Sequence, residues 1–167
     1  PPGTQFGGSN PADNSGTIQY VRVEFAGFQL SPGNELNAIT FSGVGSATTV
    51  DHIQALQGLD DAIEFFGGAV NVKYAVATSF DDDGFDWQLG WAGKAQFVAI
   101  QQQAEGVATT ERGIEADNSE FNTDATPRSE PLVANFTLVG EPDETLPGSG
   151  GEGIELRRGT AGKLRNF

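Results

Sequence analysis

Acidic residues recur at matching positions of this chain, and their types and spacing could bind a cation or carry out acid–base chemistry. Two groups share one arrangement, a pair of carboxylates in a turn followed three residues later by one in a short apolar strand: Asp60, Asp61 and Glu64, then Asp82, Asp83 and Asp86. The second group follows the first by 22 residues. Carboxylate oxygens are ligands that Ca²⁺ prefers. The sequence therefore predicts a calcium site formed by these six residues, provided that the fold places one group beside the other.

Electrostatic repulsion strengthens the case for a bound cation. Charges on adjacent strands, about 4.8 Å apart, repel by about 1 kcal/mol in water and by roughly 3–4 kcal/mol at an effective dielectric constant of 20. No lysine or arginine lies between Lys73 and Lys94 to offset this repulsion. The alternative interpretation is that the carboxylates are solvated, because Asp is common in turns for local hydrogen-bonding reasons and surface charge protects strand edges.

The same carboxylates suggest an alternative function. Pairs of carboxylates act as acid and base in glycoside hydrolases, so Asp60, Asp61, Asp82 and Asp83 could belong to a carbohydrate-active enzyme, a polysaccharide hydrolase or lyase. A cleft lined by these acids, with Trp91 exposed at a corner of the fold, would favour the enzyme. The acidic block contains no basic residue of the kind a pectate-type lyase would place beside calcium. We therefore assign no catalytic residue and favour a non-enzymatic role, with the carbohydrate-active enzyme kept as the alternative.

Composition excludes several other kinds of site and partner. The chain has no cysteine and a single histidine, His52, which rules out disulfides and thiolate metal sites and argues against catalytic zinc. Its net charge of −14 argues against nucleic acid or an anionic membrane surface as a partner. No apolar run approaches the roughly 18 residues of a membrane span.

The elements that must position the carboxylates are short apolar strands that restart after turns. Five restarts align on one apolar residue, with spacings between 22 and 40 residues: Ile39, Ile63, Phe85, Ile114 and Ile154. A second strand is expected after each, at 50–56, 72–76, 95–100, 133–139 and 163–167. A strand-built quasi-repeat of this length is typical of a solenoid whose coils stack on one another. Because side chains alternate along a strand, the carboxylates of the restarts should point away from the core.

The predicted fold class is all-β, a right-handed parallel β-helix of about five to six coils, since no segment shows a 3.6-residue apolar period. We expect an irregular leader at residues 1–15 and a single β-helix domain at 16–167, with loop insertions at 117–131 and 141–151. A first residue other than methionine and an unfinished last coil favour a fragment of a longer protein. Four of the nine basic residues lie near the C-terminus: Arg157, Arg158, Lys163 and Arg165. This basic end suggests that copies of the chain could stack end to end.

Several stretches resemble a known family: Asp13–Gly16, Tyr20–Gly27, Asn34–Asn37, Gly67–Lys73, Gly93–Phe97 and Asp124–Ser129. They are similar to secreted bacterial β-helix surface proteins, often labelled as multidomain proteins with S-layer homology or as lipoproteins of unknown function. The resemblance implies an extracellular or cell-surface location. Together with the acidic residues, it predicts a cation-stabilised structural or adhesive scaffold whose partners are a surface polysaccharide or other copies of itself.

Overall fold

Strands are the only regular elements in the part of the chain that the computed structural model describes, residues 5–32, 35–102, 112–140 and 151–167. Alternate strands belong to one sheet: β1 (Thr17–Glu24), β3 (Thr49–Gly58), β5 (Asn71–Phe80), β7 (Lys94–Gln101), β9 (Leu132–Val139) and β11 (Lys163–Arg165). The remaining strands make the other sheet: β2 (Ile39–Ser42), β4 (Ile63–Phe66), β6 (Asp83–Gln88), β8 (Arg112–Ala116) and β10 (Ile154–Leu156). Among the described residues, none forms a helix long and apolar enough to cross a membrane.

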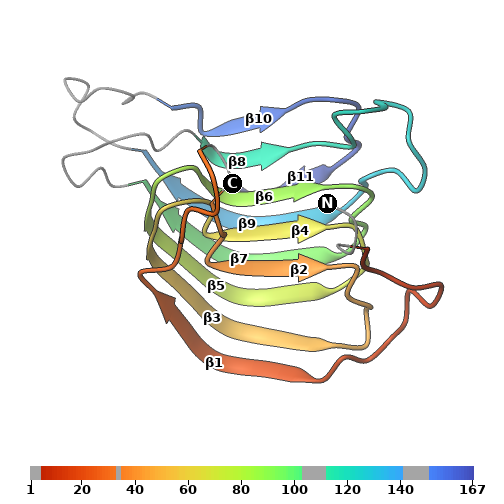
Figure 1. The fold of residues 1–167 in the computed structure, drawn as a ribbon, viewed down its shortest axis with the longest axis horizontal. Helices are drawn as coiled ribbons and strands as arrows, with labels where there is room; N and C mark the ends of the chain where they lie inside the picture. The colour runs from red at the N-terminus through yellow and green to blue at the C-terminus, as the bar shows by residue number, and fades with distance from the viewer. Residues whose placement is uncertain (1–4, 33–34, 103–111, 141–150) are drawn as a thin grey trace.

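The two sheets are the faces of a parallel β-helix. Strand order is β1-β3-β5-β7-β9-β11 in one sheet and β10-β8-β6-β4-β2 in the other, and every paired neighbour is parallel. Figure 1 shows the strands of each sheet stacked in chain order, one coil above the next. The predicted fold class, a parallel β-helix of five to six coils, is confirmed, and the five predicted restarts are β2, β4, β6, β8 and β10.

A column of aromatic rings fills the core between the sheets. Phe41, Phe65 and Phe85 come from successive coils, with ring centroids 5.1 Å and 5.0 Å apart. The Trp91 ring lies 4.1 Å from that of Phe65, and its indole N–H donates a hydrogen bond to the Val70 carbonyl oxygen at 3.1 Å. Each ring contributes apolar area and a favourable stacking geometry, so the column ties neighbouring coils together.

An exposed Trp91 at a corner would have favoured the enzyme alternative, but the side chain is fully buried. Gly93 explains how a corner residue reaches the core. A Cβ atom at position 93 would lie 2.0 Å from the Val70 oxygen and 2.5 Å from the indole nitrogen. The indole therefore occupies space that any other residue type at position 93 would fill.

A second stack lies outside the core, where the long strands bend. Tyr20, His52, Tyr74 and Phe97 each have φ between 51° and 61°. This left-handed conformation costs a residue other than glycine roughly 1–2 kcal/mol. The four rings stack with centroids 4.6, 4.7 and 5.2 Å apart, and each aromatic pair offsets about 0.5–1.5 kcal/mol of that cost.

The insertion predicted at 117–131 forms no strand and is held by one buried asparagine. The Asn118 side chain donates to the carbonyl oxygens of Thr123 and Ala125 at 3.0 Å and accepts from the Ser129 N–H at 2.8 Å. At the tip, the Phe121 side chain is 87% exposed. Of the insertion predicted at 141–151, residues 141–150 lie outside the described part of the chain.

Candidate metal centre

The carboxylates predicted to stack form a continuous column along the smaller sheet. Register pairs Thr40 with Glu64, Glu64 with Asp86, Asp86 with Glu115, and Glu115 with Glu155. The column points away from the aromatic core, as strand alternation predicts. The prediction that Glu64 lies over Asp86 is confirmed.

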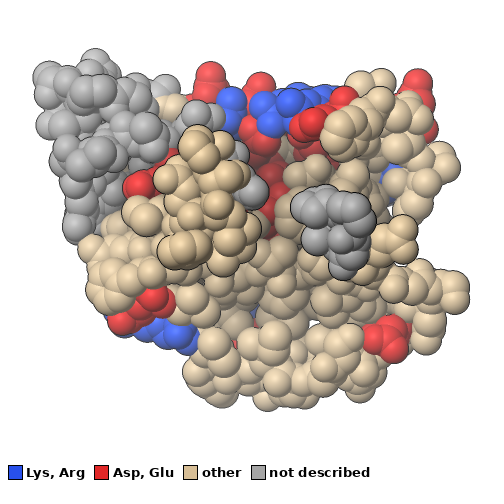
Figure 2. Space-filling view, viewed as in Figure 1, with Lys and Arg blue, Asp and Glu red and all other residues tan. Residues whose placement is uncertain are grey.

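These side chains point outward and are nevertheless buried. Glu64 and Asp86 are each 5% exposed, and Glu115 is 9% exposed. The segment between β1 and β2 provides part of the cover, because the Asn37 amide donates to a Glu64 oxygen and the Ala38 N–H donates to the Asp61 carbonyl oxygen at 2.8 Å. Figure 1 shows this segment, drawn in orange, rising across the starts of β4 and β6, and Figure 2 shows acidic side chains inside a hollow of the same face.

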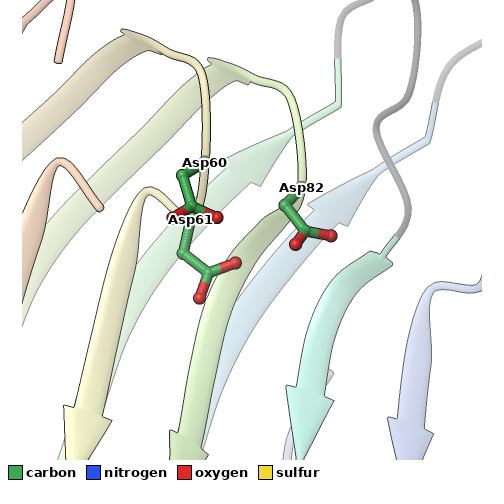
Figure 3. A group of neighbouring side chains, drawn as sticks. All are labelled: Asp60, Asp61 and Asp82. Atoms are coloured by element: carbon green, nitrogen blue, oxygen red, sulfur yellow. The ribbon is translucent and has the colours of Figure 1, made fainter. Parts of the chain in front are cut away.

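The acidic turns before β4 and β6 bring two sets of carboxylate oxygens together. One oxygen from each of Asp61, Glu64 and Asp86 lies within 4.8 Å of the others, and the same holds for Asp60, Asp61 and Asp82. Figure 3 shows Asp60 and Asp61 on the turn before β4 and Asp82 on the equivalent turn before β6. Five of the six predicted ligands therefore gather in two groups that share Asp61.

Asp83, the sixth predicted ligand, belongs to neither group. Its backbone N–H donates to Asp61 Oδ1 at 3.0 Å, which joins the two acidic turns. Its own carboxylate oxygen lies 4.0 Å from a guanidinium nitrogen of Arg112, on the next coil. The structure thus places Asp83 at the boundary between the acidic groups and a basic residue.

Hydrogen bonds satisfy the buried carboxylates only in part. Glu64 accepts from the side-chain amides of Asn37 and Gln88, the second at 2.9 Å. Asp86 Oδ1 is buried and has no hydrogen-bond partner among the described residues. A buried polar atom in this state costs about 1–3 kcal/mol, and a cation beside Asp86 would remove that cost.

The pKa values of this group are displaced upward. Burial, together with the charges of neighbouring carboxylates, raises the pKa of Asp61 and of Asp86 well above the usual range. Burial raises the pKa of Glu64 to about 7, against the hydrogen bonds from Gln88 and Asn37, which lower it. The three groups therefore resist carrying full negative charge together at neutral pH unless a cation joins them.

The upper half of the same column is neutralised by arginine. Arg112 on β8 lies 3.0 Å from Glu115 and also pairs with Glu155. Arg157 pairs with Glu115 and lies 2.9 Å from Asp117. Figure 2 shows basic and acidic side chains mixed along the upper edge of this face. Among the described residues, no lysine or arginine forms an ion pair with Asp61, Glu64 or Asp86.

Sequence reasoning missed Arg112 because it looked for basic residues only between Lys73 and Lys94. Arg112 stands two residues before Ile114, just as Asp83 stands two residues before Phe85. Register pairs Arg112 with Asp83 accordingly. The restart alignment therefore contained the signal that would have found it.

The carboxylates in the lower half of the column, Asp61, Glu64 and Asp86, have features that suit Ca²⁺. They offer oxygen ligands only, and Ca²⁺ takes six to eight of them in adaptable geometry, so carbonyl groups and water would have to complete the shell. A pocket of about 500 Å³ opens beside the acidic turns and is lined by Asp60, Asp81, Asp82, Gln29 and Glu35, among others. The pocket borders the group of Asp60, Asp61 and Asp82 through Asp60 and Asp82.

Comparison with known proteins identifies the fold family. No curated protein and no solved structure matches the chain. A family model described as a pectate-lyase-like β-helix domain matches residues 2–167. The chain belongs to this family of pectate-lyase-like β-helix domains.

Proposed function

We propose that the chain is a structural β-helix scaffold stabilised by a divalent cation, with Ca²⁺ the best fit, bound by Asp61, Glu64 and Asp86. The observation that carries the proposal is that one column of carboxylates is neutralised by arginine in its upper half and by no described basic residue in its lower half. A cation bound to Asp61, Glu64 and Asp86 would neutralise the lower half of the column, as Arg112 and Arg157 neutralise the upper half. Asp60 and Asp82 would form a second, more open position.

The proposed setting is outside the cell, as a secreted or cell-surface protein. Modules that work there bind Ca²⁺ with dissociation constants of about 10⁻⁴–10⁻³ M. A site with three carboxylate ligands, whose shell carbonyl groups and water must complete, belongs in that range. The insertion at 117–131, with Phe121 exposed at its tip, is the proposed contact surface for a surface polysaccharide.

Calcium titration tests the metal site. At a free concentration about tenfold above the dissociation constant, Ca²⁺ should stabilise the fold by about 1.4 kcal/mol, which raises Tm by about 3–6 °C. Titration calorimetry should give heat that saturates, and EDTA should reverse the change in Tm.

Two variants make this test specific. Asp86→Asn removes a buried ligand and should abolish both the heat and the change in Tm. Asp124→Asn changes an exposed carboxylate that is paired with Arg128, and it should leave both unchanged. Equal heats from the wild type and Asp86→Asn would overturn the assignment of the ion to this group.

A second candidate is cleavage of an acidic polysaccharide, the kind of activity that the family description suggests. The observation in its favour is Glu64, whose pKa of about 7 suits a general acid or base at neutral pH. Trp91 gives it no support, because the ring is buried. Incubation with polygalacturonate and Ca²⁺ would reveal new chain ends, and Glu64→Gln should abolish them. If none form with the wild type, the scaffold stands as the proposal.

A further inference from the structure

A groove runs across the outer face of the larger sheet, beside the outer aromatic stack. It is a hollow of about 550 Å³, within the range of about 300–1,000 Å³ that ligand pockets span. Its lining residues come from β3, β5, β7 and β9, which are neighbours in the sheet. Because strands lie about 4.8 Å apart, these four strands extend over about 14 Å. The groove is therefore elongated along the direction in which the coils stack.

Two columns of side chains line the groove on either side. One column consists of residues at equivalent positions of successive coils: His52, Tyr74, Phe97 and Asn135. The other lies two residues further along each strand, and the register aligns its members: Gln54, Val76, Ala99 and Thr137. The same two positions recur on each coil, so the groove is straight and nearly uniform along its length.

The lining of the groove is apolar and uncharged. Tyr74 and Phe97 are each 42% exposed and Val76 is 36% exposed, and these side chains lie beside one another along the hollow. The polar lining residues, Gln54 and Thr137 among them, carry neutral amide or hydroxyl groups, and no Lys, Arg, Asp or Glu belongs to the lining in the described part of the chain. Exposed apolar side chains gathered in one place mark an interaction site.

The orientation of the rings decides what kind of ligand fits. The Tyr74 and Phe97 rings are nearly parallel, at 9° with centroids 5.2 Å apart, and the His52 ring lies 4.7 Å from that of Tyr74. The Lys73 ammonium lies over the rings of Tyr74 and Phe97, 5.3 Å and 5.5 Å from their centroids. These contacts occupy the ring faces, so the groove meets ring edges. A sugar packs against ring faces, whereas the positive edge of a ring attracts the negative face of another aromatic system.

We propose that this groove binds an elongated, planar aromatic molecule that lies along the stacking direction. One face of the ligand would contact the ring edges of Tyr74 and Phe97, and the opposite face would pack against Val76 and Ala99. The net charge of −14 favours an uncharged or positively charged ligand over an anion. This proposal does not depend on the metal site.

Thioflavin T, a planar aromatic cation, is the probe for this groove. Its fluorescence rises when its two ring systems are held rigidly, so titration into the wild type should give an increase that saturates at one dye per chain. Sedimentation velocity, followed at the absorbance of the dye, should show the dye moving with the folded chain. A signal that does not saturate, or dye that sediments only with aggregates, would overturn the proposal.

Three variants locate the bound dye. Ala99→Lys fills one side of the groove from an exposed position, and it should weaken binding by about tenfold or more. Phe97→Ala removes a ring edge and should weaken binding to a similar degree. Val139→Lys adds the same charge to the same sheet at a position that is 48% exposed and outside the lining, and it should bind within about twofold of the wild type. Thermal melts verify that each variant is folded.

Two outcomes would contradict the assignment of the groove and of its ligand. An Ala99→Lys variant that melts like the wild type and binds the dye equally well would show that the dye lies elsewhere. Cellohexaose, a neutral linear sugar, should leave the fluorescence unchanged at millimolar concentration. If this sugar displaces the dye, the groove takes carbohydrate, and the proposed aromatic class of ligand is overturned.

Discussion

Replacing Arg112 with glutamine should destabilise the fold by about 3–5 kcal/mol, and Tm should fall by about 6–20 °C. Arg112 forms ion pairs with Glu115, Glu155 and Asp83, at the point where three coils meet. Removing one partner of a buried ion pair leaves the other charges buried together, which costs far more than the pair contributes when intact. Thermal melts in EDTA measure the loss.

Calcium should then restore part of the lost stability. In the Arg112→Gln variant, Glu115 and Glu155 lose one of the two arginines that pair with them. Their oxygens then become more available to a cation, as those of Glu64 and Asp86 already are. The melting temperature of the variant should therefore respond to Ca²⁺ more strongly than that of the wild type. Arg22→Gln changes an arginine whose side chain is 52% exposed, and it should melt like the wild type. An Arg112→Gln variant that melts like the wild type in EDTA would show that arginine does not hold the column together.

The second large effect concerns pH. The folded-state pKa of Glu64 is about 7 and its ordinary value is 4.5. The folded state therefore holds this proton more tightly than the unfolded state, and stability is lost as pH rises from the lower value through the higher one. The loss from Glu64 alone is about 3 kcal/mol. Asp61 and Asp86, whose pKa values are also raised, add to it in the same direction.

Melts in EDTA from about pH 5 to about pH 8 should show Tm falling as pH rises, and saturating Ca²⁺ should flatten the profile. Glu64→Gln should reduce the slope in EDTA. The slope is the quantity to compare, because glutamine offers one acceptor oxygen to the two amides of Asn37 and Gln88 and will melt lower for that reason alone. A Tm that rises with pH in EDTA would contradict the raised pKa values.

The repeating part of this structure could be predicted from the sequence, because stacking makes equivalent residues neighbours. Aligning the restarts on Ile63 and Phe85 placed Glu64 beside Asp86, as the register shows. The same alignment, continued to Ile114, would have placed Arg112 beside Asp83. Arg112 was missed because the alignment was not continued to that coil, although the same stacking rule applies there.

What lies over the repeating coils could not be predicted in this way. The carboxylates are buried because the segment before β2 crosses them, and Asn37 lies in that segment. The turns at the same place before β4 and β6 are far shorter, residues 59–62 and 81–82, so the repeat does not indicate where the longer segment packs. Trp91 is similar, because its burial depends on the missing side chain at Gly93 and on one carbonyl group, that of Val70.

The one-dimensional stacking of coils has a consequence for motion. Within each sheet, the strands are hydrogen-bonded to those of the neighbouring coils, so opening can proceed from either end without breaking the middle. Amide protons should therefore exchange with solvent in a graded order, slowest in β5 and β7 and fastest in β1 and β11. The carboxylates proposed to bind the ion, Asp61, Glu64 and Asp86, lie at β4 and β6, between the slowly exchanging centre and the first coil, where exchange should be fast. An ion bound there would stabilise these coils, and it would therefore limit how far local unfolding extends from the first coil toward the centre.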